Sequence, residues 1–491
     1  MWSPASSSTT PTPACARPSA VRNPVGPPPT TMTSCMACSL PPGTMAHRRR
    51  PRKDPFAARP KALALTIVRV ARTGKVGERA LPQAVFHETI EARGGSFPLH
   101  GRYDERFRPA VDAFIENFRE EEELGAGCSV VVDGETVVDL WGGWANADRT
   151  WEWDEHSTVC MMSTAKGVTG IAFNMCVDEG LIDIDKPVAH YWPEFAQNGK
   201  EGILVRWCLD HRAAIPVLTT DVMTPGGFFD YAAYIKALEV QEPLWEPGTR
   251  AAYHVHNQGF LLGEIMRRVT GMTVGPFLRS RVSGPLGAEY YIGGMSEEEQ
   301  SHVAEVLPNT GARLFAAKDQ TVPPKPSTPE GWQDGAVLRS FAFLQNPSEP
   351  WHATMNSPIW RTCEIASGSG HGNARGVARI YGAAVGEVDG ISLLSKNALE
   401  AMLVEQHNQI ELLQDRPYHQ ALGVLLNTPE AVYMGPNMRS FGHHGLGGSI
   451  GFGDPDAKLG FSYCCNQMHA VGTNGPRARR LIDAVYGVVD G

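Results

Sequence analysis

Ser163-Thr164-Ala165-Lys166 places a serine and a lysine three residues apart at the start of a segment with helical character. Positions i and i+3 of a helix lie on one face, so the lysine amine can reach the serine hydroxyl. A neutral lysine there is a general base that turns a poor nucleophile into a good one. A chance match, in which Ser163 is only a helix N-cap and Lys166 is solvated, is the competing interpretation.

A second segment, WEPGTRAAYH at residues 245–254, places a tyrosine after a Pro-Gly turn. Tyr253 then precedes a helix that we expect from about Asn257 to Val269. A phenol beside a protonated lysine is readily deprotonated, because the cation stabilises the phenolate. Tyr253 can therefore carry a proton between a serine hydroxyl and a leaving group. Taken alone, an ordinary half-buried tyrosine is the simpler interpretation.

A third segment, FGHHGLGGS at residues 441–449, combines closely spaced glycines with two histidines. Glycines in a strand let a ligand lie against the backbone, and peptide N–H groups there can hold an oxyanion. A glycine-rich edge strand is the alternative. His443 and His444 are neighbours in the expected strand and therefore face opposite ways, so we expect no metal site.

Together, and in this order, the three segments resemble the serine β-lactamase-like hydrolases. That family includes class C β-lactamases, D-alanyl-D-alanine carboxypeptidases and esterases of the same fold, and the resemblance is strongest to the esterase branch. It runs from about Phe97 to Gly491. Supporting phrases are VDLWGG at 138–143, HYWPEF at 190–195 and GNAR at 372–375.

The resemblance implies a role for each of these residues. Ser163 is then the nucleophile, Lys166 the base beside it and Tyr253 the proton relay. The backbone N–H groups of Ser163 and Leu446 form the oxyanion hole. The stretch His443-His444-Gly445 takes the place of the substrate-binding Lys-Thr-Gly strand. The resemblance implies a small-molecule ester as substrate and requires no cofactor or metal.

Two departures from the family pattern bear on the substrate. Val255 stands two residues after Tyr253, where β-lactamases carry asparagine, and His443 replaces the strand lysine that binds carboxylates. A histidine is only partly charged near neutral pH. Neutral esters are therefore the expected substrates. A β-lactamase, a D-amino-acid peptidase, an acyltransferase and a non-catalytic binding protein on this fold remain alternatives.

The segment Gly447-Gly448-Ser449-Ile450-Gly451 matches a different motif, the G-x-S-x-G turn of α/β-hydrolases. That turn requires a strand before the serine and a helix after it. A short apolar run, Asp454-Pro455 and another apparent strand follow instead. We therefore do not expect Ser449 to be a nucleophile.

The pattern of apolar residues predicts an α+β fold, a mixed α/β sandwich. Its antiparallel sheet is built from both chain ends and flanked by helices, with a helical subdomain inserted at about 185–430. A hairpin is expected around Asp133-Gly134. Further strands are expected at 449–453 and 460–463, and helices at 106–121, 164–179 and 477–489.

Residues 1–95 are expected to be a disordered or non-native extension, and residues 96–491 the hydrolase domain. The first 53 residues contain no Asp or Glu and are rich in Pro, Ser and Thr, a composition that cannot bury enough apolar surface to fold. An over-long gene model, with a true start at Met45 or later, would explain them.

The net charge of −9 disfavours a nucleic-acid partner. No apolar run is long enough to span a membrane. The 10 cysteines form no disulfide framework, which indicates a reducing, cytoplasmic location. The oligomeric state is not indicated.

Overall fold

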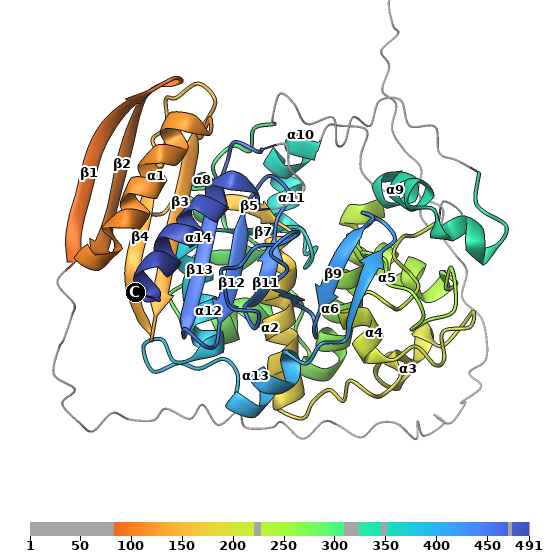
Figure 1. The fold of residues 1–491 in the computed structure, drawn as a ribbon. Coiled ribbons are helices and arrows are strands. Elements are labelled where there is room, and N and C mark those ends of the chain that lie inside the picture. Colours follow the sequence, from red (N-terminus) through yellow and green to blue (C-terminus); the bar gives the residue numbers. More distant parts are fainter. Residues whose placement is uncertain (1–82, 220–226, 309–323, 345–350, 470–473, 491) are drawn as a thin grey trace, which may run out of the picture. The chain divides into compact units, whose positions relative to one another are not determined.

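A computed structural model describes residues 83–219, 227–308, 324–344, 351–469 and 474–490 of the chain. They belong to one compact unit, Gly77–Gly491. Its centre is a 10-stranded antiparallel sheet in the order β1-β2-β4-β3-β13-β12-β11-β10-β9-β8 (Figure 1). The predicted α+β class, with a sheet made from both chain ends, is confirmed.

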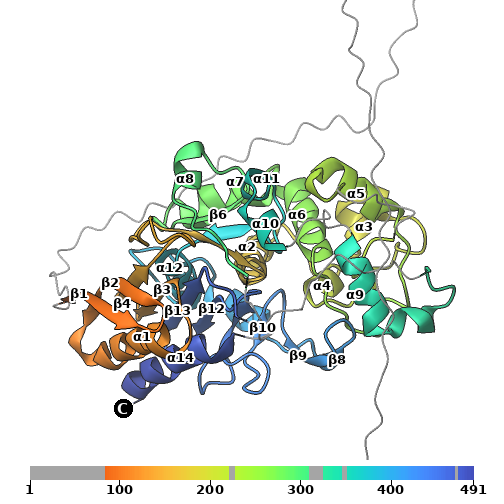
Figure 2. The same ribbon diagram turned by 90° about the horizontal axis from the view of Figure 1, so that it is seen from above.

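The two chain ends meet where strand β13 (Leu459–Cys465) pairs with strand β3 (Gly125–Val132). Strand β3 continues into β4 (Glu135–Gly143) through the predicted Asp133-Gly134 turn. On one face of the sheet, helix α1 (Arg108–Glu120) packs against the last helix, α14 (Gly475–Val489). Figure 2 shows these two helices on the opposite side of the strands from α12.

The sheet begins earlier than the sequence indicated. Strands β1 (Gln83–Ala92) and β2 (Gly95–Asp104) form a regular hairpin at its edge. The prediction that the domain starts at residue 96 is therefore wrong for residues 83–95, while residues 1–82 lie outside the described part. Only Phe86 and Ile90 of β1 are buried, so this edge strand carries little apolar signal.

The other face of the sheet is covered by helix α12 (Ala374–Val385), which packs on β3, β12 (Ile450–Asp454) and β13. Glycines allow the close approach. A Cβ at Gly451 would lie 2.5 Å from Val377, and one at Gly460 would lie 2.3 Å from the carbonyl oxygen of Ala378. Helix α2 (Thr164–Asp178) lies beside α12 and contacts β11 (Phe441–His444).

The predicted helical region is interrupted and ends before residue 430. Six short strands lie within or near it. The first three named in the next sentence form a separate sheet, and the last three extend the main sheet. They are β5 (Val159–Met162), β6 (Tyr290–Ile292), β7 (Gly370–Gly372), β8 (His407–Glu411), β9 (Arg416–Gln420) and β10 (Leu425–Leu426). Strand β8 is the edge of the sheet and β9 pairs with it. Both are largely polar, so the sequence did not distinguish them from loops.

The remaining helices lie in the region between β5 and β8. They are α3 (Val188–Tyr191), α4 (Val205–Leu209), α5 (Tyr231–Val240), α6 (Asn257–Thr270), α7 (Val274–Leu278), α8 (Glu297–Ser301), α9 (Gly335–Leu344), α10 (Trp351–Asn356), α11 (Pro358–Thr362) and α13 (Lys396–Met402). Within the described ranges, no helix has both the length and the apolar character needed to cross a membrane.

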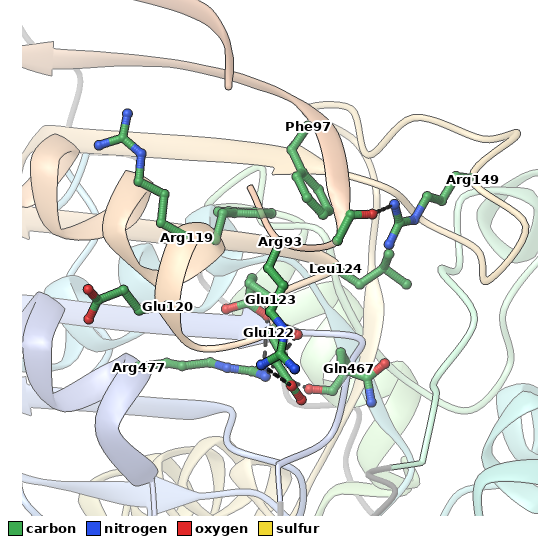
Figure 3. A pocket seen from close by; sticks show the side chains of 12 residues that line it. Arg93, Phe97, Arg119, Glu120, Glu122, Glu123, Leu124, Arg149, Gln467 and Arg477 are labelled. Carbon is green, nitrogen blue, oxygen red and sulfur yellow. Dashed lines mark hydrogen bonds and ion pairs between the residues drawn. The ribbon is translucent and has the colours of Figure 1, made fainter. Parts of the chain in front are cut away.

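A pocket of about 340 Å³ lies between the β1–β2 turn, the end of α1 and the start of α14 (Figure 3). At its base Arg477 and Glu123 form a buried ion pair with an N–O distance of 3.0 Å. The Tyr463 hydroxyl also donates to Glu123, and the other guanidinium hydrogens go to the backbone carbonyls of Glu121, Glu122 and Gln467. These buried charges satisfy one another, so we assign no ligand to this pocket.

The buried ion pair leads to a prediction about stability. Replacing Arg477 by methionine leaves Glu123 buried without its partner, which is expected to cost about 3–5 kcal/mol. Arg439→Met is the matched control, because its pairs with Glu400 and Asp456 are exposed and contribute at most about 1 kcal/mol. Urea unfolding followed by circular dichroism measures both. Equal losses in the two variants would contradict this account.

Candidate active site

Ser163 lies at a sharp turn between strand β5 and helix α2. The preceding Met162 has φ +48, a left-handed conformation that is uncommon for a residue with a side chain. Ser163 is the N-cap residue of α2, but its side chain makes no capping hydrogen bond. The competing interpretation of Ser163 as a capping serine is therefore wrong. Its side chain is half-buried, which leaves the hydroxyl open to a ligand.

Lys166 follows one turn later and is buried, with only 2% of its surface exposed. Its Nζ lies 2.7 Å from the carbonyl oxygen of Val255 and 2.9 Å from that of Ser367. Burial lowers the pKa of Lys166 well below its usual value. A neutral amine has two hydrogens and one lone pair. The two carbonyls accept the hydrogens, and the lone pair remains available to take a proton.

Tyr253 packs against this lysine, with Nζ of Lys166 4.6 Å from the centre of its ring. Burial raises the pKa of the Tyr253 hydroxyl, and a side-chain hydrogen bond with Ser163 acts in the opposite direction. The structure thus brings Ser163, Lys166 and Tyr253 together from distant segments. Burial favours a neutral amine and a neutral phenol in the resting site.

The strand β11 forms the next wall of the site. The His443 ring lies 6.0 Å from the Tyr253 ring and nearly parallel to it. The Nδ1 of His443 is 2.7 Å from the carbonyl oxygen of His444, so Nδ1 carries the hydrogen. Burial lowers the pKa of His443 to about 3. This histidine is therefore neutral around pH 7. The expectation from the sequence, a partly charged histidine, is wrong.

His444 interacts with a cation. Its Nε2 lies 3.0 Å from Nη2 of Arg416, on strand β9. The guanidinium also lies over the ring of Tyr418, 5.6 Å from its centre. The ring centres of His443 and His444 lie 5.4 Å apart, so the expectation that the two side chains face opposite ways is wrong. In the described parts of the chain, no three or more His, Cys, Asp and Glu side chains are arranged to hold a metal ion.

The turn after β11 lies against the strand that leads into Ser163. The N–H of Gly445 donates to the carbonyl of Ser449 at 2.7 Å, and a Cβ on Gly445 would lie 2.1 Å from the Met161 carbonyl oxygen. Half-buried Leu446 follows Gly445. Among the described residues, neither the backbone N–H of Leu446 nor that of Ser163 has a hydrogen-bond acceptor. Both donors are available to a ligand.

Ser449 has a structural role in the same turn. Its hydroxyl lies 2.9 Å from the Met161 carbonyl oxygen and 3.2 Å from the Thr164 hydroxyl. Strand β12 follows it directly, without the helix that the α/β-hydrolase turn needs. The prediction that Ser449 is not at a nucleophile turn is confirmed.

One buried carboxylate near the site was not found from the sequence. Glu411, on β8, accepts the backbone N–H of Tyr253 at 2.8 Å and those of Leu413 and Gln414 at 2.9 and 2.6 Å. It therefore fixes the tyrosine from a strand 158 residues further along the chain. A single glutamate in a polar edge strand gives no local signal of that role.

Comparison with protein families identifies the class to which this fold and this site belong. The family model described as beta-lactamase matches residues 111–486. The chain belongs to the beta-lactamase family. The match contains Ser163, Lys166, Tyr253 and the β11 turn.

Individual relatives place the chain more narrowly. The esterase/beta-lactamase LipL of Mycobacterium tuberculosis is 30% identical over 373 residues, 75% of this chain and 83% of that protein. A crystal structure of a family VIII carboxylesterase is 33% identical, with a TM-score of 0.71, and covers 79% of this chain and 99% of its own. A penicillin-binding protein homologue from Caulobacter crescentus is 32% identical, with a TM-score of 0.69 and the same coverage. These relatives place the chain in the esterase branch of the family.

Proposed function

We propose that this protein is a serine hydrolase that cleaves carboxylic esters through an acyl-enzyme on Ser163. One arrangement carries the proposal: half-buried Ser163 acts on Tyr253 and lowers the pKa of its hydroxyl, and a buried lysine with a lowered pKa packs on that tyrosine. The serine is accessible, whereas the lysine and tyrosine are shielded from water, which suits a nucleophile and its proton-transfer partners.

In the acylation step, the lone pair of Lys166 accepts the Ser163 proton, directly or through the Tyr253 hydroxyl. The serine oxygen attacks the ester carbonyl carbon, and the negative charge develops on the carbonyl oxygen. The N–H groups of Ser163 and Leu446, which have no acceptor among the described residues, would stabilise that charge. Tyr253 then passes the proton to the departing alkoxide, and the carbon–oxygen bond of the ester breaks.

In the deacylation step, water replaces the alcohol. Tyr253 and Lys166 take a proton from the water as it attacks the acyl carbon. The Ser163–acyl bond breaks, the proton returns to the serine oxygen, and the acid leaves. An alcohol in place of water turns the same step into acyl transfer, so hydrolysis and transfer differ only in the acceptor.

The neutral His443 supports esters without a carboxylate as the preferred substrates. At this position it offers no positive charge to a β-lactam or peptide carboxylate. Two observations favour a second candidate, β-lactam hydrolysis: Arg416 places a cation beside His444, and the relative LipL carries beta-lactamase in its name. Substrate comparison decides between the two.

The test compares p-nitrophenyl butyrate with a chromogenic cephalosporin as substrates of the full chain. We expect kcat/KM for the ester to exceed that for the cephalosporin by about 100-fold or more, because a missing charge partner for a carboxylate costs roughly 2–3 kcal/mol. Equal values would move the assignment to a β-lactamase. Added methanol, with methyl butyrate measured as product, reports acyl transfer. Absence of turnover and of acylation would indicate a binding protein.

A further inference from the structure

A buried histidine that the proposed mechanism does not use lies directly behind Tyr253. His211 is 1% exposed and has φ +66, a left-handed conformation that is uncommon for residues other than glycine. It follows helix α4 in a tight loop, and Ala214 three residues later is also left-handed, with φ +60. Backbone strain of this kind persists only where surrounding contacts hold it.

The contacts of His211 are with the segment that carries the catalytic tyrosine. Its carbonyl oxygen accepts the N–H of Ala252 at 3.1 Å, and its ring Nδ1 accepts the N–H of His254 at 3.1 Å. The N–H of Tyr253 between them goes to Glu411. The edge of the His211 ring also meets the Tyr253 ring, with centres 5.0 Å apart.

This support matters because residues 251–254 belong to no helix or strand. A loop segment has no ladder of backbone hydrogen bonds to fix the direction of its side chains. Here His211 supplies two of the acceptors for three successive amides, and Glu411 supplies the third. The position of the Tyr253 hydroxyl relative to Ser163 therefore depends on these bonds.

The hydrogen bond to Nδ1 also defines the tautomer of His211. An Nδ1 that accepts an N–H carries no hydrogen, so the neutral ring has its hydrogen on Nε2. His254 has the opposite tautomer, because its Nδ1 lies 2.7 Å from the Ala252 carbonyl oxygen. A protonated His211 would bring two hydrogens together at the bond to His254. The bond thus requires the neutral ring that burial favours.

We propose that His211 is a positioning residue for Tyr253: its Nδ1 and its carbonyl oxygen hold the tyrosine segment in the geometry for proton transfer. The inference rests on the proposed function of Tyr253. It does not place His211 in contact with the substrate. Its effect on turnover is therefore expected to pass through the tyrosine hydroxyl alone.

Three variants separate this role from a general effect on folding. His211→Asn tolerates a left-handed backbone and offers Oδ1 as an acceptor near the position of Nδ1. His211→Gly keeps the backbone conformation and removes the acceptor. Tyr253→Phe removes the hydroxyl on which the inference depends, and combining it with His211→Gly closes a double-mutant cycle. Circular dichroism and thermal unfolding show which variants fold.

We expect His211→Gly to lower kcat for p-nitrophenyl butyrate about 10- to 100-fold with little change in KM, because small misplacements of a catalytic group have effects of that size. His211→Asn is expected to restore kcat to within about 3-fold of wild type. In the Tyr253→Phe background, His211→Gly is expected to lower kcat no further, since coupled residues act as a unit.

Equal kcat values for the asparagine and glycine variants would overturn the inference. It would also be overturned if His211→Gly lowered kcat in the Tyr253→Phe background as much as it does in the wild-type background. In both results wild-type ester hydrolysis is intact, so the proposed function stands. A wild-type protein without ester hydrolysis would refute the proposed function and this inference with it.

Discussion

Replacing Ser163 by alanine is expected to lower kcat for ester hydrolysis by about 10⁴-fold or more, as loss of a nucleophile does in other serine hydrolases. In the proposed mechanism Ser163 forms the covalent bond to the acyl group, and no neighbouring residue has that role. The fold is expected to remain, because the Ser163 side chain makes no capping hydrogen bond and is half-buried. Initial rates with p-nitrophenyl butyrate, together with circular dichroism, measure both effects.

The matched control is Ser449→Ala, which removes the serine of the G-x-S-x-G match. Its hydroxyl only ties the β11–β12 turn to Met161 and Thr164, so we expect kcat to fall by no more than about 10-fold, in line with the loss of one or two hydrogen bonds. An inactive Ser449→Ala beside an active Ser163→Ala would reverse the assignment of the nucleophile.

Replacing Lys166 by methionine is expected to lower kcat by about 10²- to 10⁴-fold, the range for loss of a general base. Methionine has a similar length and no proton acceptor of this strength. Lys166→Arg is expected to be equally inactive, because a guanidinium stays protonated at any pH the protein survives. Wild-type-like rates in the arginine variant would show that a cation, and not a base, is required at this position.

The same variant has a predicted signature in stability. The pKa of Lys166 is lowered in the folded protein, whereas in the unfolded chain it returns to about 10.4. Between these two values the unfolded state binds one more proton, so the wild-type protein loses stability as pH falls, by about 1.4 kcal/mol per pH unit. This loss ends below the folded pKa. Lys166→Met lacks the group and should not show it.

The measurement is the free energy of unfolding of wild type and Lys166→Met from pH 10 down to pH 6. As pH falls, the free energy of unfolding of wild type is expected to decrease relative to that of Lys166→Met. A constant difference across this range would mean that Lys166 is protonated in the folded protein. It could not then act as the resting base.

The sequence predicted the central parts of the structure because their signals are local. Ser163 and Lys166 share a helical turn, and the hairpin at Asp133-Gly134 has a specific turn sequence. The α+β class followed from strands near both ends and a helical middle. The strands β1, β8 and β9, at or next to the sheet edges, were missed for a common reason: they bury few side chains, so their alternation of apolar residues is weak.

The electrostatics of the site could not be predicted, because burial depends on residues far away in the chain. Burial in the surrounding core lowers the pKa of Lys166, and burial likewise makes His443 neutral. Glu411 and His211 are unremarkable in sequence. Each acts through backbone groups of residues 252–254, a contact that no motif or spacing reveals.

The most direct test of the central claim is to identify the residue that becomes acylated. The wild-type protein is treated with a fluorophosphonate ester, digested, and mapped by tandem mass spectrometry, with residual esterase activity measured in parallel. We predict one adduct on Ser163 that appears in proportion to the loss of activity, and none in Ser163→Ala. Loss of activity with the adduct on another residue, Ser449 included, would contradict the account.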